Sequence, residues 1–433
     1  MHHFRDFKSF AEAELNLLQP VTILIGPNGS GKSNLIEGVE LLAQVAHGRP
    51  LHEIADIGRG YAGALEIRGG LEACPREGRD SFALGFGAAT RFRDTVSQPF
   101  RYEVSVAARP TPRITRERLV LRERGKFRDI LATQAPQGSR PDDFVTVRYD
   151  NFRRGGNKPT ARIRSDRSAL SQYDAFATDN DQAEECSELV GTLRDHLRAS
   201  FVFEPDPKAM RDYERIADQP LARNGANLSA VLFSLSKQGG GTGEVLARLQ
   251  ERIRQVPQEP FTEIDFVSTE LNDVIFGFGQ NGDGPMLDAR MLSDGTLRCL
   301  AVLTALETAE EGSRIVIEEL DNGLHPSRVQ VLVQALYECA EERRLNVLAT
   351  THNPATLDAL TGDRLGAVVV CTRDAPDGTS RLVRLKDMPR FIEFAERGKL
   401  GDLVTRRVID QYLSSDSEEE HQRKMREWLE ALA

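Results

Sequence analysis

Apolar and polar positions follow two different periods along the first part of the chain. Alternation over residues 7–25 ends in a mostly apolar run, which predicts a buried strand at residues 21–25. A glycine-rich turn follows directly, and apolar residues then recur at helical spacing over residues 34–46. The pattern therefore predicts a strand, a loop and a helix in that order.

Alternating segments return at residues 64–71, 81–86 and 100–107 and predict an antiparallel sheet. From Met291 onward, helical and strand patterns take turns, with strands expected at residues 314–317, 346–350 and 367–372. Such alternation is typical of a parallel sheet covered by helices. The predicted fold class is α/β, a mixed sheet with helices.

The middle of the chain has mixed periodicity, with a basic strand-like segment and short helical stretches at residues 181–199, 227–235 and 243–256. We interpret it as an inserted α+β subdomain. The predicted division is an N-terminal lobe (1–108), the insertion (109–284), a C-terminal lobe (285–395) and a tail (396–433). The tail carries an acidic stretch and one apolar stripe, which predicts a helix docked on its own body, or on a partner: Met425, Trp428, Leu429, Leu432.

Charge is unevenly distributed over a chain whose net charge is −10. From Arg101 to Arg167 there are 17 Lys or Arg and 8 Asp or Glu, a net +9 that leaves −19 for the rest. This window can contact DNA or RNA, although a basic run is more often a solvated surface. Tyr149 and Phe152 lie within it.

Hydrophobic residues make up 40% of the chain, an ordinary share for a globular protein, and no apolar run is long enough to cross a bilayer. The N-terminus lacks the features of a signal peptide, so we expect a cytoplasmic protein without membrane contact. The five cysteines are far apart and form no metal-binding pair, so we expect small buried residues.

A phosphate-binding loop is the strongest motif. The segment Gly26-Pro27-Asn28-Gly29-Ser30-Gly31-Lys32-Ser33 fits G-x-x-x-x-G-K-[ST] between a predicted strand and helix. Its backbone N–H groups can surround phosphate oxygens, Lys32 can reach the β- and γ-phosphates, and Ser33 can bind Mg²⁺. The predicted nucleotide-binding residues are Asn28, Gly29, Ser30, Gly31, Lys32, Ser33 and Asn34.

Two acids end the apolar strand at residues 314–317. Glu318 and Glu319 stand at its carboxyl edge, where ligands bind in this architecture. The first is expected to hold the metal and the second to polarise the attacking water, while a solvated turn is the alternative. His352 ends the next strand, where it can contact a γ-phosphate; a lone histidine is more often a surface residue.

A second helix begins at the segment Leu292-Ser293-Asp294-Gly295-Thr296, with Ser and Gly at its N-terminus. One nucleotide does not need two helix N-termini from distant parts of one chain. A second subunit that brings the other terminus resolves this, so we expect a head-to-tail homodimer or a higher even oligomer.

In their order these segments resemble the ABC-type ATPases related to RecF, SMC proteins and the ATPase part of OLD-family nucleases. The resemblance implies ATP and Mg²⁺ as cofactors, an ABC-type P-loop ATPase head as the fold, and ATP hydrolysis as the activity. The loop corresponds to Walker A, Leu292–Thr296 to the signature motif, Glu318-Glu319 to Walker B and His352 to the switch histidine. It further implies that Ser293 and Gly295 contact the γ-phosphate across the dimer and that Glu319 is the general base.

Two departures from the family pattern stand out. The first Walker B acid is usually Asp and is here Glu318, and only Gln98 offers itself for the Q-loop glutamine. The favoured function is a bacterial defence or DNA-transaction ATPase that regulates a separately encoded, nuclease-like effector. A RecF-like repair ATPase is the alternative, and the nucleotide-binding subunit of a transporter is the third.

Overall fold

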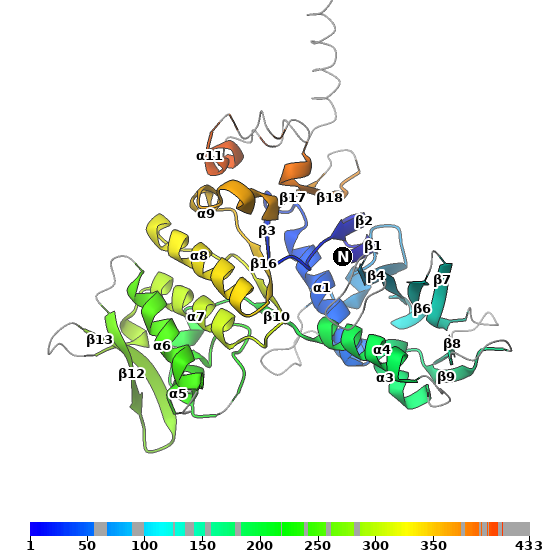
Figure 1. The fold of residues 1–433 in the computed structure, drawn as a ribbon, viewed down its shortest axis with the longest axis horizontal. Helices are drawn as coiled ribbons and strands as arrows, with labels where there is room; N and C mark the ends of the chain where they lie inside the picture. Colours follow the sequence, from blue (N-terminus) through cyan, green and yellow to red (C-terminus); the bar gives the residue numbers. More distant parts are fainter. Residues whose placement is uncertain are drawn as a thin grey trace, which may run out of the picture. The chain divides into compact units, whose positions relative to one another are not determined.

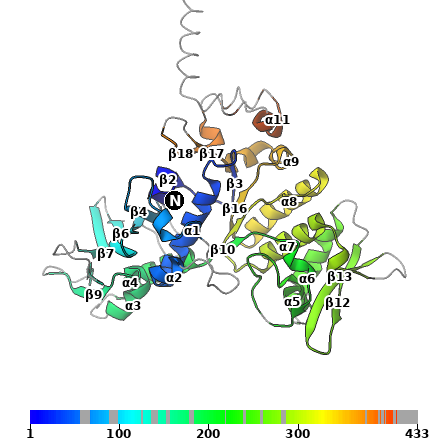
Figure 2. The ribbon, with the colours of Figure 1, turned by 180° about the vertical axis from the view of Figure 1, so that it is seen from behind.

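The structure, a computed structural model, describes residues 1–55, 67–88, 99–123, 126–134, 143–151, 157–177, 183–217, 219–237, 241–256, 261–280, 286–373, 377–388, 391, 396, 398–405 and 409. Its elements are labelled in Figure 1 and seen from behind in Figure 2. The chain forms two compact units. The first contains Met1–Leu18, Asn28–Val202 and Thr372–Leu382, and the second contains the remaining stretches.

An eight-stranded antiparallel sheet builds the first unit, in the order β2-β1-β4-β5-β6-β7-β8-β9. Its side chains alternate between the core and solvent: on β5, Tyr102 and Val104 are buried, while Arg101 is exposed. The strands are β1 (His2–Phe7), β2 (Phe10–Leu15), β4 (Ser81–Ala88), β5 (Phe100–Ala107), β6 (Arg113–Glu123), β7 (Lys126–Thr133), β8 (Phe144–Tyr149) and β9 (Thr160–Arg164).

Helix α1 (Lys32–His47) packs on β1 and β4, and α3 (Ala169–Phe176) packs on β9. The other helical elements of this unit are α2 (Leu51–Ala55), η1 (Leu71–Ala73) and α4 (Ala183–Arg198), of which α2 and α4 contact α1. Helix α1 approaches β1 at Gly38, where a Cβ would lie 2.6 Å from the Phe4 ring. The rings of Phe7 and Phe10 lie 6.3 and 6.1 Å from that of Phe4, so an aromatic cluster fixes α1 on the sheet.

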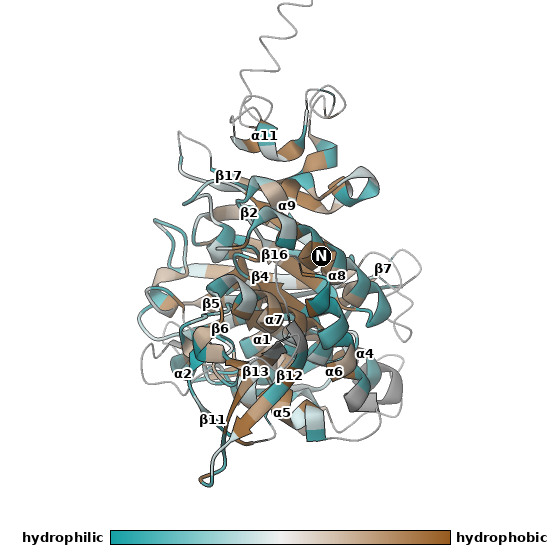
Figure 3. Ribbon diagram, turned by 90° about the vertical axis from the view of Figure 1, so that its left-hand side faces the viewer, coloured by the Kyte–Doolittle hydropathy of each residue, from teal (hydrophilic) through white to brown (hydrophobic). Residues whose placement is uncertain are grey.

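A parallel sheet forms the centre of the second unit, with strands in the order β15 (Arg314–Ile317), β16 (Asn346–Thr350), β3 (Val21–Ile25) and β17 (Val368–Arg373). Strands β10 (Ser200–Phe203) and β18 (Ser380–Arg384) stand at its edges, and each contains a point where the chain passes between the units. Its helical elements are α7 (Asp294–Thr308), α8 (Pro326–Glu342), α9 (Pro354–Asp358), η4 (Gly362–Ala367), η5 (Leu385–Asp387) and α11 (Leu400–Thr405). Helix α8 buries one apolar stripe, and its hydrophilic side is teal in Figure 3.

The second unit also contains a hairpin of β12 (Phe261–Ser268) and β13 (Asp273–Gln280), on which α5 (Leu228–Lys237) and α6 (Gly241–Arg254) pack. Shorter elements adjoin it: η2 (Ala209–Arg211), β11 (Glu214–Arg215), β14 (Leu287–Asp288) and η3 (Ala289–Met291). The carboxylate of the buried Glu307 on α7 forms ion pairs with the Nε atoms of Arg248 and Arg252 on α6, each at 3.0 Å. A buried carboxylate is stable only when paired in this way, so the network ties α6 to α7.

The patterned segments before and after the middle of the chain form the expected elements. The strand at residues 21–25, the helix after it and the strands at 314–317 and 346–350 are confirmed. The strand expected at 64–71 is wrong in its described part, where Gly69 and Gly70 adopt positive φ of 79° and 66° and η1 begins at Leu71.

The predicted boundary at residue 108 falls between β5 and β6, which are neighbours in one sheet, so the compact units follow other divisions. The division into 1–108, 109–284, 285–395 and 396–433 stays a prediction, and the expected tail helix lies outside the described residues. No helix in the described ranges could span a membrane. Four cysteines are buried, as expected: Cys74, Cys299, Cys339 and Cys371.

Glu117 of β6 is a buried acid that caps helix α3. Its Oε2 accepts the Ala169 N–H at 2.6 Å, and its Oε1 accepts the Leu170 N–H at 2.8 Å and the Tyr102 hydroxyl at 2.9 Å. Burial raises the pKa of Glu117 to about 7, although all three donors favour the carboxylate.

Because this pKa is raised in the folded state, the contribution of Glu117 to stability is complete below the unfolded pKa and is lost as the pH rises through about 7. We expect the unfolding free energy of wild type, relative to Glu117→Gln, to fall between about pH 5 and about pH 7 in urea denaturation. Glu103→Gln, on the solvent side of β5, is the control. Parallel pH profiles for wild type and Glu117→Gln would contradict this role.

Candidate nucleotide site

The loop between β3 and α1 has the backbone that its glycines permit. Gly26, Gly29 and Gly31 adopt positive φ of 150°, 78° and 112°, and Gly31 is the N-cap of α1. Other residue types rarely adopt these angles. Asn28 and Gly29 are exposed, whereas Ser30 is buried. The loop therefore presents its tip to solvent at the N-terminus of a 16-residue helix.

Two serines that sequence reasoning missed brace this loop. The Ser380 hydroxyl donates to the Ser30 carbonyl at 2.5 Å, and the Ser380 N–H donates to the Ser9 carbonyl at 2.8 Å. The Asn34 side chain donates to the Ser9 hydroxyl at 2.8 Å. A Cβ on Gly31 would lie 2.6 Å from Ser380 Oγ. Both this close approach and the positive φ angle therefore favour glycine at position 31.

The carboxyl ends of β15, β16 and β3 meet at one edge of the parallel sheet. Ile317 lies opposite Ala349, and Thr350 lies opposite Leu24. The Thr351 N–H donates to the Leu24 carbonyl at 3.2 Å. Both acids that follow β15, the turn after β16 and the start of the glycine loop at Gly26 therefore begin at the same edge.

Glu318 and Glu319 differ in their surroundings. The Glu318 N–H donates to the Phe203 carbonyl at 3.1 Å, and its carboxylate lies 4.0 Å from the Arg223 guanidinium. Glu319 has a positive φ of 48°, and its N–H donates to the Thr350 hydroxyl at 2.9 Å. Asn322 donates to the Glu319 carboxylate at 2.7 Å. A non-glycine residue in this conformation is strained and is held by its neighbours, as is common at functional sites.

Asp321, which sequence reasoning did not single out, is the buried acid of this turn. Its Oδ2 accepts the Thr351 hydroxyl at 2.6 Å and the Thr356 hydroxyl, while Oδ1 has no hydrogen-bond partner among the described residues. Burial raises its pKa; the two threonines and the nearby His352 act in the opposite direction. Exposed His352 therefore lies close to the acids that follow β15.

Ser293 and Gly295 shape the N-terminus of α7. Ser293 is the N-cap, and its hydroxyl accepts the Thr296 N–H at 3.1 Å. A Cβ on Gly295 would lie 3.3 Å from the Gly323 carbonyl and 3.4 Å from Leu324, in the turn after β15. The small residue thus lets the predicted signature segment pack on the turn that follows the two acids.

Arg298, one turn further along α7, lies among acids. Burial lowers its pKa, while Glu319 is the strongest of four carboxylates that raise it, with Asp206, Asp294 and Asp321. The helix that begins at Ser293 is therefore also coupled electrostatically to Glu319 in the same chain.

The second unit thus contains five of the twelve predicted site residues: Glu318, Glu319, His352, Ser293 and Gly295. The loop residues from Asn28 onward, including Lys32 and Ser33, belong to the first unit and continue the chain from β3 through Gly26 and Pro27. Gln98 lies outside the described residues.

The loop fits a triphosphate, because its left-handed glycines allow consecutive N–H groups to face one anion and its tip is exposed. Within the described ranges, no cluster of three or more His, Cys, Asp or Glu could hold a metal. Mg²⁺ usually takes only one or two protein ligands beside water and phosphates, so Ser33 and Glu318 suit it in kind.

A family described as "AAA domain, putative AbiEii toxin, Type IV TA system" matches residues 21–358. Short segments are similar to the DNA replication and repair protein RecF, at 51% identity over 55 residues in Gloeobacter violaceus and 34% over 96 residues in Paenarthrobacter aurescens. These matches cover 13% and 22% of this chain, and the chain matches only 15% and 24% of those relatives.

Solved SMC structures are similar over most of the chain at low identity. An SMC head bound to the C-winged helix domain of ScpA matches 88% of this chain and 96% of its own, with 13% identity and a TM-score of 0.45. The SMC head domain from Thermotoga maritima matches 88% and 97%, with 14% identity and a TM-score of 0.36.

The Asp321 network yields a stability prediction. Thr356→Val keeps the shape of the side chain but removes one donor to a buried carboxyl, so the unfolding free energy should fall by roughly 1–3 kcal/mol in urea denaturation. Thr356→Ser keeps the hydroxyl and is the matched control. An unchanged Thr356→Val protein, or an equal loss in both variants, would contradict the importance of this hydrogen bond.

Proposed function

Because the chain belongs to the family of AAA domains described as putative AbiEii toxin, type IV toxin–antitoxin system, we propose that it hydrolyses ATP in a head-to-tail dimer. It is an ABC-type ATPase of the RecF and SMC kind. One observation carries the proposal: Glu318 and Glu319 follow β15 at the sheet edge where β3 enters the glycine loop.

In this proposal the loop residues Asn28–Asn34 hold the phosphates, with Lys32 on the β- and γ-phosphates and Ser33 and Glu318 as the metal ligands. Bound Mg²⁺ would neutralise phosphate charge. Glu319 accepts a proton from the attacking water, and its fixed backbone and the Asn322 contact orient the carboxylate. His352 contacts the γ-phosphate from the end of β16.

The proposed dimer rests on the N-terminus of α7. Ser293 caps this helix, and Gly295 leaves no side chain between it and the following turn. A γ-phosphate held by the loop of one copy would meet Ser293 of the partner subunit and Gly295 of the partner subunit. ATP would then close the dimer and hydrolysis would reopen it.

We further propose that this cycle regulates a separately encoded, nuclease-like effector in bacterial defence or DNA transactions. The family description, which includes a toxin–antitoxin system, supports this choice. A RecF-like repair role is the second candidate, supported by the segments similar to RecF. A transporter subunit is the least favoured. Copurification of a nuclease supports the first candidate.

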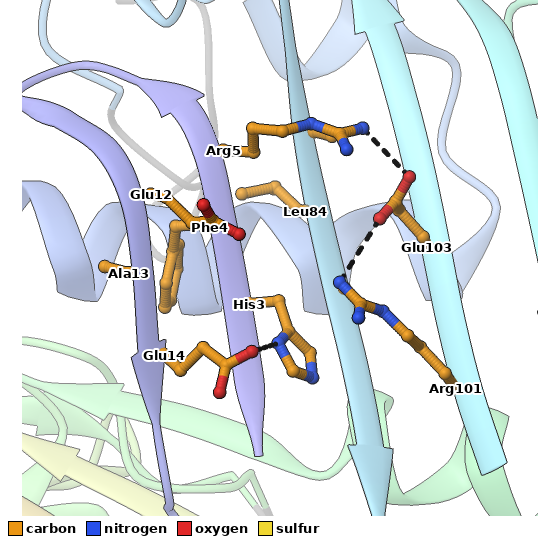
Figure 4. Close-up of a pocket in the computed structure, with 11 residues that line it drawn as sticks. His3, Phe4, Arg5, Glu12, Ala13, Glu14, Leu84, Arg101 and Glu103 are labelled. Carbon is orange, nitrogen blue, oxygen red and sulfur yellow. Dashed lines mark hydrogen bonds and ion pairs between the residues drawn. The ribbon is translucent and has the colours of Figure 1, made fainter.

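A nucleic-acid contact is a separate proposal that rests on the solvent face of the first unit's sheet. Figure 4 shows one end of this face, where Glu103 lies between Arg5 and Arg101 at 2.9 and 3.6 Å. Further along, Asp129 is shared by Arg118 and Arg148 at 2.6 and 3.3 Å. Glu12 and Glu14 also line the end shown in Figure 4, so the positive excess lies further along the face, where two guanidinium groups share Asp129.

The far end of the same face adds an aromatic ring to this charge. Phe144 is 42% exposed, and the Arg162 guanidinium lies 4.7 Å from its centroid. Arg164 stands opposite Phe144 on β9. Guanidinium groups beside exposed rings suit a nucleic-acid backbone with unstacked bases. Of the aromatic residues expected in the basic window, Tyr149 is buried and Phe152 lies outside the described residues.

Glu319→Gln should retain ATP while hydrolysis falls by roughly 10²- to 10⁴-fold, because the general base is lost and the charge-independent contacts remain. Phosphate release and retention of radiolabelled ATP are the measurements. Lys32→Ala is the companion variant, which should bind ATP weakly in calorimetry. If Glu318→Gln abolishes turnover and Glu319→Gln is nearly silent, the two acids have been assigned in the wrong order.

Replacing Arg148, Arg162 and Arg164 together by Ser should weaken binding to single-stranded DNA for all sequences alike, because phosphate contacts carry no base information. The slope of log affinity against log salt should flatten by about one per lost contact. Arg254→Ser and Arg344→Ser, on the second unit, are controls. Wild-type protein with ATP and Mg²⁺ that binds no DNA or RNA at low salt would refute this contact.

A further inference from the structure

A single guanidinium holds the segment that leads into α7. Arg211 Nη1 donates to the carbonyls of Ala289, Arg290 and Leu292 at 3.2, 3.0 and 2.8 Å. Its Nη2 forms an ion pair with Asp294, the first residue of α7. The fork of one arginine therefore contacts four of the six residues from 289 to 294, and Ser293 lies between the last two of these contacts.

The backbone that carries Arg211 is itself fixed. The neighbouring Met210 is completely buried, and Gly225, at a φ of 76°, lies against it so closely that a Cβ there would be 2.5 Å from Met210 Cε. Asp206 accepts the Lys208 N–H at 3.0 Å in the preceding turn. Arg211 thus projects from a turn that is anchored by the buried Met210.

Overall stability does not explain this arrangement. The side chains of Arg211 and Asp294 are 26% and 69% exposed, and ion pairs of this kind contribute little to folding. Three carbonyls that converge on one cation, by contrast, define a local geometry. The contacts of Arg211 therefore mainly fix the backbone conformation of residues 289–294.

The segment before α7 also carries exposed side chains. Met291 is 67% exposed, an unusual state for a large apolar side chain, and Arg290 lies over the ring of the partly exposed Tyr213 at 5.7 Å. Methionine, tyrosine and arginine are enriched at subunit contacts, so these exposed side chains suit one. Asp294, however, places a negative charge where a phosphate would approach, so an anion can bind here only if that charge is neutralised.

We infer that Arg211 is a positioning residue for the α7 half-site, which holds Ser293 in place and neutralises Asp294 so that this end of the helix accepts the triphosphate bound by a second copy. The inference rests on the proposed head-to-tail dimer. Arg211 touches no nucleotide in this scheme and acts only through the loop.

The test measures ATP-dependent self-association by analytical ultracentrifugation in the Glu319→Gln protein, in which bound ATP persists. Adding Arg211→Gln should raise the dimer dissociation constant at least about tenfold, the effect of losing one charge-assisted contact. The affinity of the monomer for a fluorescent ATP analogue should not change, because the glycine loop is intact. Arg254→Gln, an exposed arginine of α6, is the matched control.

Two further variants separate positioning from a general folding defect. Arg211→Lys keeps the charge but not the fork and should lie between wild type and Arg211→Gln. Asp294→Asn, placed in the Arg211→Gln protein, should restore part of the association, because the uncompensated carboxylate is gone. No restoration would refute the electrostatic half of the inference.

Unchanged association in Arg211→Gln, with wild-type association intact, would overturn the inference and leave the dimer standing. Absence of ATP-dependent association in the parent Glu319→Gln protein would instead refute the dimer and the inference together. A loss of monomer affinity for the analogue in Arg211→Gln would place the defect in the nucleotide loop and also overturn the inference.

Discussion

The register of three parallel strands is the constraint on which the site depends. With Ala349 between Ile317 and Ile23, strands β15, β16 and β3 end at one edge, so two acids, a histidine turn and a glycine loop start together. A slip by one residue would shift the two acids relative to the glycine loop by one residue's rise, about 3.3 Å. The Asp321 hydrogen bonds to Thr351 and Thr356 then hold the turn after β15 against the segment that follows β16.

Local chemistry explains why much of this could be predicted. The sequence of β15 is a continuous apolar run, and the apolar residues of α1 recur at helical spacing, so each pattern predicts one kind of element. The glycine loop likewise lies between an apolar strand, β3, and helix α1. Ser293 was expected to start a helix because a serine side chain accepts a backbone N–H there. These features depend on residues within a few positions of one another.

The remaining features join residues that are distant in sequence. Ser9 and Ser380 brace the glycine loop, and Arg211 holds the segment before α7. No sequence pattern indicates which distant residue a single serine or arginine will contact. Alternation predicts strands but not which strands share a sheet, so the continuation of β5 into β6 was not foreseen. At residues 64–71 alternation predicted a strand, but the positive φ angles of Gly69 and Gly70 are incompatible with one.

The brace on the glycine loop has a consequence for the order of events on the ribosome. Ser30 and Ser380 are separated by 350 positions, so the loop leaves the exit tunnel 350 residues before one of its supports. A nascent chain can form β1, β2 and α1 early, but the hydrogen bond that restrains Ser30 must wait until Ser380 has been synthesised. For the same reason, an N-terminal fragment excised for biochemical work would carry the whole motif and lack this support.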